Sequence, residues 1–334
     1  MKLLAVVLLL GLATGCGSGS KTGHGGRIVG AGSTLVAPLV ARWQSGTKAR
    51  GVTLVYGPIG SGGGIEQVTD RTVDFGASDA PLTADQAKAC HGCVQIPWAL
   101  AATAVSYNVP GVSRPLRLTG PVVADLYLGT IKRWNDPRIA KLNPGLRLPS
   151  TAVAPVYRSD ASGDTFAFTD YLSQVSPAWR SSVGRASTGV SWPTGTGARG
   201  NAGVAATVET TPGAVGYAAI GQAVDSRLHY AEVENRDGAF VAPTTATIAA
   251  AARTARFGLD NAASIVDPPA SAKDAYPIST FTYAIVPRKA AKLAALETFL
   301  TYAVTAGQRY APALEFAPLP RNVVREDRSI IAGL

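Results

Sequence analysis

The stretch VYRSDASGDTF (156–166) joins an apolar, strand-like run to a helix-like run through a turn of small polar residues. The same order recurs from Arg27 onward, because short apolar runs alternate with segments of helical periodicity. The apolar runs are RIVGAG, TLVYGP, TVDFGAS, TAVSYNV, AVAPVYRSD, AVGYAAI and FTYAIVP. This alternation predicts an α/β architecture with a mainly parallel sheet.

The length and the last quarter of the chain favour two lobes. Roughly 310 residues remain once an N-terminal leader is removed, which exceeds the size at which chains usually divide into domains. The run YPISTFTYAIVP (276–287) is typical of a buried strand, and KAAKLAALETFLTYAV (289–304) follows with helical periodicity. If this strand and helix complete the first sheet, the chain crosses between the lobes twice. We therefore expect lobe I at 27–107 plus 278–334, and lobe II at 108–277.

The N-terminus has the form of an export signal. Lys2 precedes the apolar stretch LLAVVLLLGLA, and small residues lead to Cys16, so the segment is too short to span a bilayer as a mature helix. The residues before Cys16 look like a lipobox, which predicts a lipoprotein signal peptide at 1–16 and a lipid on Cys16. An ordinary signal peptide with an incidental cysteine is the alternative. Residues 17–26 are polar and glycine-rich, as in a flexible tether.

The other two cysteines lie close together in CHGC (90–93). In an oxidising compartment, a disulfide between Cys90 and Cys93 is the favoured interpretation. A redox site or a metal pair is the alternative, although two ligands alone make a poor metal site. The residue after Cys93 is a valine, which excludes attachment of a c-type haem.

The composition indicates a globular protein that does not bind nucleic acid. Hydrophobic residues make up 46% of the chain, and the formal net charge is +9. The basic residues are spread along the sequence without interleaved aromatic residues, so they are interpreted as solvated surface.

Two early helix starts follow glycine-rich turns. In IVGAGSTLVAPLVARW, Pro38 fits only the first turn of a helix, so the helix is expected to begin near Thr34 or Leu35. In YGPIGSGGGIEQV, Ser61 is expected to be the N-cap of the next helix. The first turn of a helix presents unpaired N–H groups and a partial positive charge, both of which favour anions.

Two further junctions carry ionisable groups. A strand in VDFGASDAPL (73–82) ends near Asp79, and Ser162 is expected to cap the helix that follows Arg158. A single capped helix usually binds nothing. Several together with an arginine, in a two-lobed exported protein, favour a small oxyanion as the ligand. The nearby carboxylates are compatible with that ligand if the anion carries a proton.

The chain resembles the phosphate-binding lipoproteins and periplasmic proteins of Pst-type ABC phosphate importers, from about Val29 to its C-terminus. The stretches that carry the resemblance are GAGST (30–34), VDFGASDAPL (73–82), LGTIKRWNDPRIAKLNPGLRLP, RSDASGDTFAFTDYL, TPGAVGY (211–217) and YPIST. The resemblance implies an α/β, two-domain periplasmic-binding-protein fold of type II, a Venus-flytrap that closes on dehydrated phosphate.

The resemblance also implies roles for particular residues. Asp79 would accept the proton of the bound phosphate, and Arg158 would supply a charge-assisted hydrogen bond while Asp160 orients it. Asp164 stands where many members have threonine, which removes a hydroxyl donor and keeps the backbone N–H. The phosphate-binding residues that the resemblance assigns are Thr34, Leu35, Ser61, Asp79, Arg158, Ser162, Gly163 and Asp164.

The predicted site distinguishes phosphate from sulfate through a proton. Sulfate has none at neutral pH, so Asp79 would face it as an unpaired carboxylate, whereas hydrogen phosphate donates to Asp79. A second carboxylate at Asp164 raises the hypothesis that the site accepts or prefers dihydrogen phosphate, or holds Asp164 partly protonated. Arsenate, which carries the same proton, should be excluded much less well.

Other classes fit the sequence poorly. The GSGGG turn lacks the Gly-Lys-Ser/Thr of a P-loop, and the S-x-x-K match at 45–48 lacks its partner motifs. With three histidines in the chain, neither a nucleophile with its base nor a metal cluster is evident. We therefore expect no enzyme activity, no cofactor and no metal. The remaining alternatives are a receptor for another oxyanion and a surface adhesion lipoprotein.

The sequence thus predicts an extracytoplasmic receptor, anchored to the cell membrane by an N-terminal lipid. Its expected partners are inorganic phosphate and the permease of an ABC transporter with its ATPase, and it is expected to be a monomer.

Overall fold

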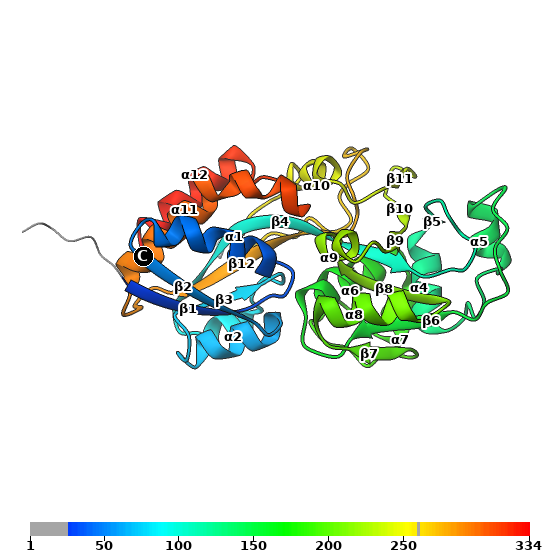
Figure 1. Cartoon of the computed structure of the whole chain (residues 1–334), viewed down its shortest axis with the longest axis horizontal. Helices are drawn as coiled ribbons and strands as arrows, with labels where there is room; N and C mark the ends of the chain where they lie inside the picture. The colour runs from blue at the N-terminus through cyan, green and yellow to red at the C-terminus, as the bar shows by residue number, and fades with distance from the viewer. Residues whose placement is uncertain (1–25, 259–260) are drawn as a thin grey trace, which may run out of the picture.

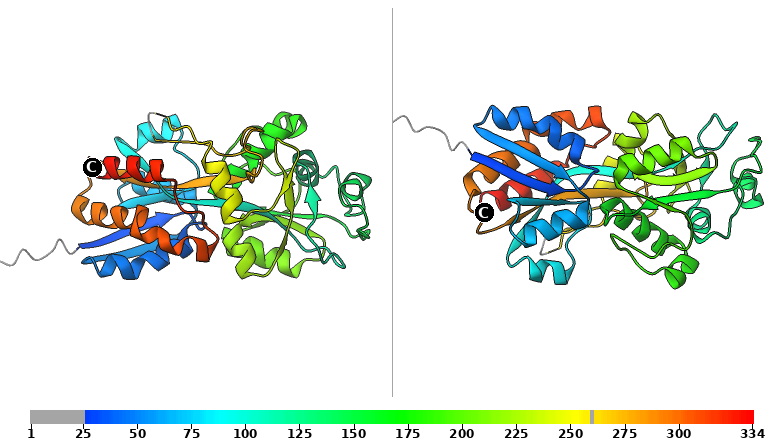
Figure 2. Two further views of the ribbon diagram at one scale, coloured as in Figure 1. Left: turned by 90° about the horizontal axis from the view of Figure 1, so that it is seen from above. Right: turned by 60° about the horizontal axis from the view of Figure 1, so that its bottom comes forward.

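The computed structural model describes residues 26–258 and 261–334. The predicted signal peptide, the lipidation site at Cys16 and nearly all of the tether lie outside these residues. The described chain is an α/β protein whose elements gather into two lobes side by side along the long axis (Figure 1 and Figure 2). Among the described residues, no helix is long and apolar enough to cross a membrane.

Lobe I contains the first and last segments of the chain. Its strands are β1 (Gly26–Gly32), β2 (Val52–Pro58), β3 (Phe75–Ser78), β12 (Ser279–Pro287) and the first part of β4 (Cys93–Tyr107). Its helices are α1 (Ala37–Lys48), α2 (Ser61–Thr69), α3 (Ala84–Ala89), α11 (Leu293–Val304) and α12 (Arg321–Ile331), with short 3₁₀ turns η1 (Ala306–Tyr310) and η2 (Pro312–Leu314). Helices α1, α11 and α12 lie on one side of the strands and α2 on the other (Figure 1).

Lobe II is built from the middle of the chain. The large sheet continues through β8 (Ala214–Ala219), β6 (Ala154–Arg158) and β7 (Thr196–Ala198), and β9 (His229–Tyr230) also pairs with β4. A small second sheet contains β5 (Arg117–Leu118), β10 (Glu232–Glu234) and β11 (Phe240–Val241). The helices are α4 (Gly120–Leu128), α5 (Pro137–Leu142), α6 (Gly163–Val175), α7 (Pro177–Ser182), α8 (Gly200–Thr210), α9 (Ile220–Asp225) and α10 (Thr245–Ala252).

Each lobe has its own cluster of aromatic rings. In lobe I, the rings of Trp43, Trp98 and Phe299 pack edge-on or tilted against one another, with centroids 5.4–6.2 Å apart. In lobe II, Phe168 stacks on Tyr217 at 4.4 Å. Large buried rings remove much apolar area from water in each lobe, and most of the buried apolar residues of the two lobes belong to one continuous core.

Strand β4 connects the lobes. Up to Ala102 it pairs with β12, and from Thr103 to Tyr107 it pairs with β8. The partner changes slightly earlier in the chain than the predicted crossing at 107/108, and the Thr103 N–H donates to Ile278 O on the returning segment. The two crossing segments therefore lie side by side. The exact division of the chain into lobes stays a prediction.

The prediction of a mainly parallel sheet is wrong, because the sheet is mixed. β1 pairs in parallel with β2 and β3, and β6 does so with β7 and β8. Strands β4 and β12 run antiparallel to every strand beside them. The alternation of strands and helices predicts the parallel units correctly, but it carries no information on the two strands that run between the lobes.

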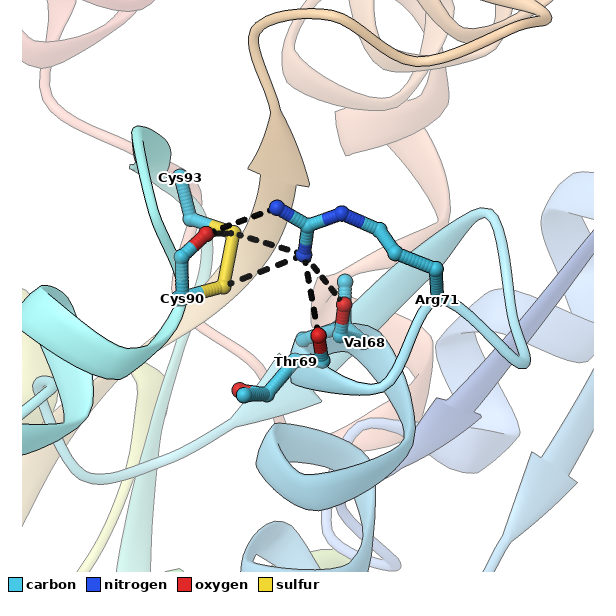
Figure 3. Close-up of a disulfide and its surroundings, with 5 residues drawn as sticks. All are labelled: Val68, Thr69, Arg71, Cys90 and Cys93. Atoms are coloured by element: carbon cyan, nitrogen blue, oxygen red, sulfur yellow. Dashed lines mark hydrogen bonds between the residues drawn. A yellow bond between two sulfur atoms is a disulfide. The ribbon is translucent and has the colours of Figure 1, made fainter.

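Cys90 and Cys93 form the predicted disulfide, which lies against the end of α2 (Figure 3). The guanidinium of Arg71 donates to the carbonyl of Val68 at 2.6 Å and to that of Cys90 at 2.7 Å, and it lies 3.7 Å from both sulfurs. The disulfide loop is thereby fastened to the last turn of α2.

Candidate functional site

Helix starts from both lobes meet between the ends of several strands. Lobe I contributes the turn after β1, the start of α2 and the residue after β3. Lobe II contributes the end of β6, the start of α6 and the start of α8. The side chains that meet there and are almost completely buried are Ser33, Ser61, Asp79, Arg158, Ser162, Asp164 and Asn201.

Asp79 has one satisfied and one unsatisfied carboxylate oxygen. Its Oδ2 accepts hydrogen bonds from the hydroxyls of Ser33 at 2.8 Å and Ser61 at 3.2 Å. Its Oδ1 is buried without a partner among the described residues. Burial, with repulsion from Asp164 as a smaller cause, raises the pKa of Asp79 to about 7, although the hydroxyl of Ser33 and the charge of Arg158 lower it. Oδ1 is thus positioned to share a proton with a ligand.

Arg158 is held by two carboxylates. Its Nε and Nη2 donate to the two oxygens of Asp160, and its Nη1 donates to Asp164 Oδ2 at 3.0 Å. The Arg158 backbone N–H donates to the hydroxyl of Tyr217, which fixes the end of β6. The two parallel bonds to Asp160 restrict rotation of the guanidinium, because bidentate pairing fixes its plane.

Asp164 receives donors on both of its oxygens. Oδ1 accepts from the hydroxyl of Thr103 at 2.9 Å, while Oδ2 accepts from Arg158 and from the side-chain amide of Asn201 at 2.9 Å. Burial raises the pKa of Asp164, and the charge of Arg158 opposes that increase. In this structure the carboxylate acts as a second counter-ion to Arg158, and its backbone N–H donates to Ser162 Oγ.

Direct hydrogen bonds connect the lobes. The Gly163 N–H donates to Ser61 Oγ at 3.1 Å, and the Gly62 N–H donates to the carbonyl of Ala161 at 3.0 Å. The Asn201 amide donates to Thr34 Oγ1 at 3.0 Å. A Cβ on Gly163 would lie 2.4 Å from the Cβ of Asp79, so only glycine permits this approach. The structure is therefore a closed arrangement of the two lobes.

Two of the predicted helix starts need correction. Helix α1 begins at Ala37, not near Thr34 or Leu35, because Ser33 Oγ accepts the N–H of Leu35 and holds the chain in a turn before the helix. Ser61 is the first residue of α2 and not its N-cap. Gly60 is the N-cap, with a φ of 93°.

The cap on α6 is confirmed. Ser162 Oγ accepts from the N–H groups of Asp164 and Thr165. The hydroxyl of Ser61 does not cap α2. It donates to the carboxylate of Asp79 and accepts from the backbone N–H of Asp79.

The structure brings the residues predicted to bind phosphate to one region. Three further residues, Ser33, Thr103 and Asn201, form hydrogen bonds with Asp79 or Asp164 there. Ser33 lies inside the GAGST stretch, so the pattern of hydroxyls after a strand contained a signal for it. Thr103 lies in the middle of an apolar strand, and Asn201 lies at a helix start without a distinctive motif. Their contacts depend on the packing of the lobes, which no local pattern reports.

The site has the chemistry of a binding site for a small protonated oxyanion. It combines neutral hydroxyl and backbone donors and one cation, which pair with protein acceptors in this structure, with one buried carboxylate oxygen that lacks a partner among the described residues. Among residues 26–258 and 261–334, no group of histidine, cysteine, aspartate or glutamate side chains could hold a metal ion. A cavity of about 560 Å³ lies elsewhere, between the start of β4 and α12.

Comparisons with known proteins identify the family of this chain. Residues 17–306 match the family model described as "PBP superfamily domain". The phosphate-binding protein PstS of Xylella fastidiosa (strain Temecula1 / ATCC 700964) is 38% identical over 305 residues, covering 90% of this chain and 83% of that protein. PstS of Pasteurella multocida (strain Pm70) is 38% identical over 304 residues, covering 90% and 88%.

Solved structures share the fold. A high-affinity periplasmic phosphate-binding protein (PfluDING) bound with phosphate superposes with a TM-score of 0.70 at 22% identity, covering 91% of this chain and 93% of that one. A putative phosphate ABC transporter substrate-binding protein from Clostridium perfringens, with bound phosphate, gives a TM-score of 0.66 at 18% identity, covering 88% and 100%. These likenesses identify the fold as the two-lobed, mixed α/β fold of periplasmic binding proteins.

Proposed function

This chain belongs to the PstS family of phosphate-binding proteins, and from that premise we propose that it captures inorganic phosphate between its two lobes and delivers it to the permease of an ABC transporter. The relatives are named as phosphate-binding proteins and not as enzymes, which agrees with the expectation of no catalytic activity. The energy for transport comes in this proposal from the ATPase of the transporter.

The observation that carries the proposal is the unpartnered Oδ1 of Asp79, buried beside hydroxyl and backbone donors from both lobes. A buried acceptor without a donor is costly, so a ligand that brings its own proton is favoured there. Hydrogen phosphate supplies that proton and also accepts hydrogen bonds through its other oxygens. Sulfate supplies no proton and would meet the carboxylate as a like charge.

The magnitude of the discrimination follows from the same contact. Sites that require a particular hydrogen bond reject analogues without it by roughly 10⁴–10⁵. We expect rejection of sulfate to approach that range. Arsenate carries a proton in the same place, so we expect it to compete far more effectively than sulfate.

Equilibrium dialysis with labelled phosphate, competed with sulfate, tests the proposal directly. We expect Arg158→Ala to weaken phosphate binding severely, by roughly 10²-fold or more, because it removes a charge-assisted bond and leaves Asp160 and Asp164 without their counter-ion. We expect Asp79→Asn to erode the rejection of sulfate, because an amide donates where the carboxylate repels.

The exposed residues Arg114 and Asp237 provide matched controls. Neither Arg114→Ala nor Asp237→Asn should change the affinity for either anion. A wild-type protein that binds sulfate as tightly as phosphate would refute the proposal in favour of a receptor for another oxyanion. A protein that binds neither anion would favour an adhesion role.

The second carboxylate should make binding sensitive to pH. Asp79 and Asp164 lie in one buried site that holds a single arginine close to them, and each has a raised pKa. We propose that the complex holds an additional proton, on dihydrogen phosphate or on Asp164. The affinity should then fall as the pH rises from 5 to 8, with a steeper slope in the wild type than in Asp164→Thr. Identical slopes for the two proteins would end this hypothesis.

We propose that Cys16 carries a lipid that anchors the protein on the outer side of the cell membrane, where it acts as a monomer. The small residues before Cys16 and the polar tether after it support this proposal. The variant Cys16→Ala should appear in the soluble fraction of exporting cells, whereas the wild type should sediment with membranes. Equal solubility of both forms would exclude the lipid anchor.

A further inference from the structure

The side chain of Asn201 makes three hydrogen bonds in a fully buried position. Its Oδ1 accepts from the backbone N–H of Ala219 at 2.9 Å. Its Nδ2 donates to Asp164 Oδ2 at 2.9 Å and to Thr34 Oγ1 at 3.0 Å. Both donors of the amide are in use, and the N–H of Ala219 fixes its orientation, because a flipped amide would bring two donors together.

The three bonds are divided unequally between the lobes. Asp164 and Ala219 belong to lobe II, as Asn201 does, whereas Thr34 follows β1 of lobe I. Separating the lobes would break only the bond to Thr34 and would leave one amide proton without its partner. The bond between Asn201 and Thr34 therefore exists only in the closed arrangement.

Asn201 also contacts the ion pair of the site. Asp164 Oδ2 accepts from both Asn201 and Arg158, so the amide and the guanidinium share one oxygen. The other oxygen of Asp164 accepts from Thr103, at the point where β4 changes its partner from β12 to β8. Through Asp164, the anion-binding arginine is connected to the crossing strand and, by way of Asn201, to lobe I.

We propose that Asn201 is a positioning residue that couples the arrangement of Arg158 and Asp164 to closure of the lobes, a proposal that rests on the proposed phosphate-binding function. Asn201 holds Asp164 in the orientation that pairs with Arg158, and the same amide holds Thr34 when the lobes meet. Closure of the lobes thus keeps the guanidinium of Arg158 in its orientation against Asp164, and that orientation in turn favours the closed arrangement. Loss of the amide should shorten the lifetime of the complex more than it slows its formation.

The kinetic test uses the exported protein carrying Cys16→Ala, with phosphate binding followed by stopped flow. We expect Asn201→Ala to raise the dissociation rate roughly 10-fold and to change the association rate less than about 3-fold, because the broken bond forms after encounter. Asn143→Ala is the matched control, since Asn143 is also buried but donates only to carbonyls of Arg117 and Ile139. It should leave both rates unchanged.

A double-mutant cycle separates coupling from simple loss of packing. Asn201→Ala should have a smaller effect in a Thr34→Val background than in the wild type, and Thr34→Ser, which keeps the hydroxyl, should restore the full effect. Additive effects of Asn201→Ala and Thr34→Val would overturn the proposal. So would an unchanged dissociation rate in Asn201→Ala.

Small-angle X-ray scattering reports closure without reference to affinity. With phosphate, with sulfate and with neither anion, Asn201→Ala should show a larger radius of gyration than the wild type in every condition in which the wild type closes. A wild type that closes without binding phosphate would refute the proposed function. The comparison of its radius of gyration with that of Asn201→Ala would still show whether Asn201 favours closure. A wild type that never closes would overturn both proposals.

Discussion

Two buried aspartates of this protein experience opposite surroundings. Asp164 accepts from three side chains on its two oxygens. Asp327, on the inner face of α12, has no hydrogen-bond partner for either oxygen among the described residues. The nearby amide of Asn261 donates to the carbonyl of Gln95. Burial raises the pKa of Asp327 to about 8, because the ionised form has lost its water. The amide of Asn261 opposes this increase, and repulsion from Glu326 adds to it.

This difference predicts how stability depends on pH. The folded-state pKa of Asp327 lies above its unfolded value, so its contribution is fully present below about pH 4 and is lost as the pH rises toward 8. Asp327→Asn cannot ionise. The free energy of unfolding of the variant, relative to that of the wild type, should therefore rise between pH 4 and pH 8 by up to about 5 kcal/mol.

Urea unfolding at several pH values measures this gain. Asp237→Asn is the control, because Asp237 is exposed and lies between β10 and β11 in lobe II, and it should follow the wild type. Parallel curves for Asp327→Asn and the wild type would show that Asp327 is ionised at no cost in the folded protein.

The C-terminal end of helix α2 is held by the loop that the Cys90–Cys93 disulfide closes. Cys90 packs in a small apolar cluster with Ile65 and Val68 of α2, separate from the main core. Arg71 donates to the last carbonyls of the helix and to Cys90 O (Figure 3). The opposite end of α2 carries Ser61, about two turns away, so the disulfide supports the helix that presents Ser61 to the proposed phosphate site.

We expect the double variant Cys90→Ser, Cys93→Ser to lose about 2 kcal/mol of stability, the amount that closing so short a loop contributes. The loss should be local, so the amides of α2 should exchange with solvent faster while those of lobe II do not change. Hydrogen exchange with and without a reductant measures this. Arg71→Met keeps the disulfide and should show a weaker form of the same effect, whereas uniform acceleration over both lobes would contradict the local role.

The elements that the sequence predicts are those set by local forces. The apolar runs became strands because short runs of β-branched and aromatic residues favour a buried strand whichever segments pair with them. Ser162 caps α6 because the cap lies within one turn. Ser61 failed as a cap because Gly60 adopts a φ of 93° and turns the serine toward Asp79. The antiparallel course of β4 and β12 and the contacts of Asn201 arise between segments far apart in the sequence, so no local pattern contains them.

For the whole molecule, closure depends on how near two backbones can approach. The start of α6 in lobe II lies against Asp79 in lobe I, and the N–H of Gly163 reaches Ser61. A Cβ at position 163 would meet Asp79 atoms at 2.4, 2.6 and 2.8 Å. Contacts that short force the lobes apart, since Asp79 is itself fixed by Ser33 and Ser61.

Gly163→Ala should therefore abolish tight phosphate binding without harming the fold. Alanine in a helix is more stable than glycine by up to about 1 kcal/mol, so the melting temperature without phosphate should not fall. Binding stabilises a protein by RT ln(1 + [L]/Kd), so the wild type should melt at a higher temperature with phosphate and the variant should not. Gly203→Ala in α8 is the matched control, because its Cβ would meet its nearest neighbour at an ordinary 3.7 Å. It should keep the full thermal shift, and an equal shift in Gly163→Ala would mean that the lobes hold phosphate without meeting at this glycine.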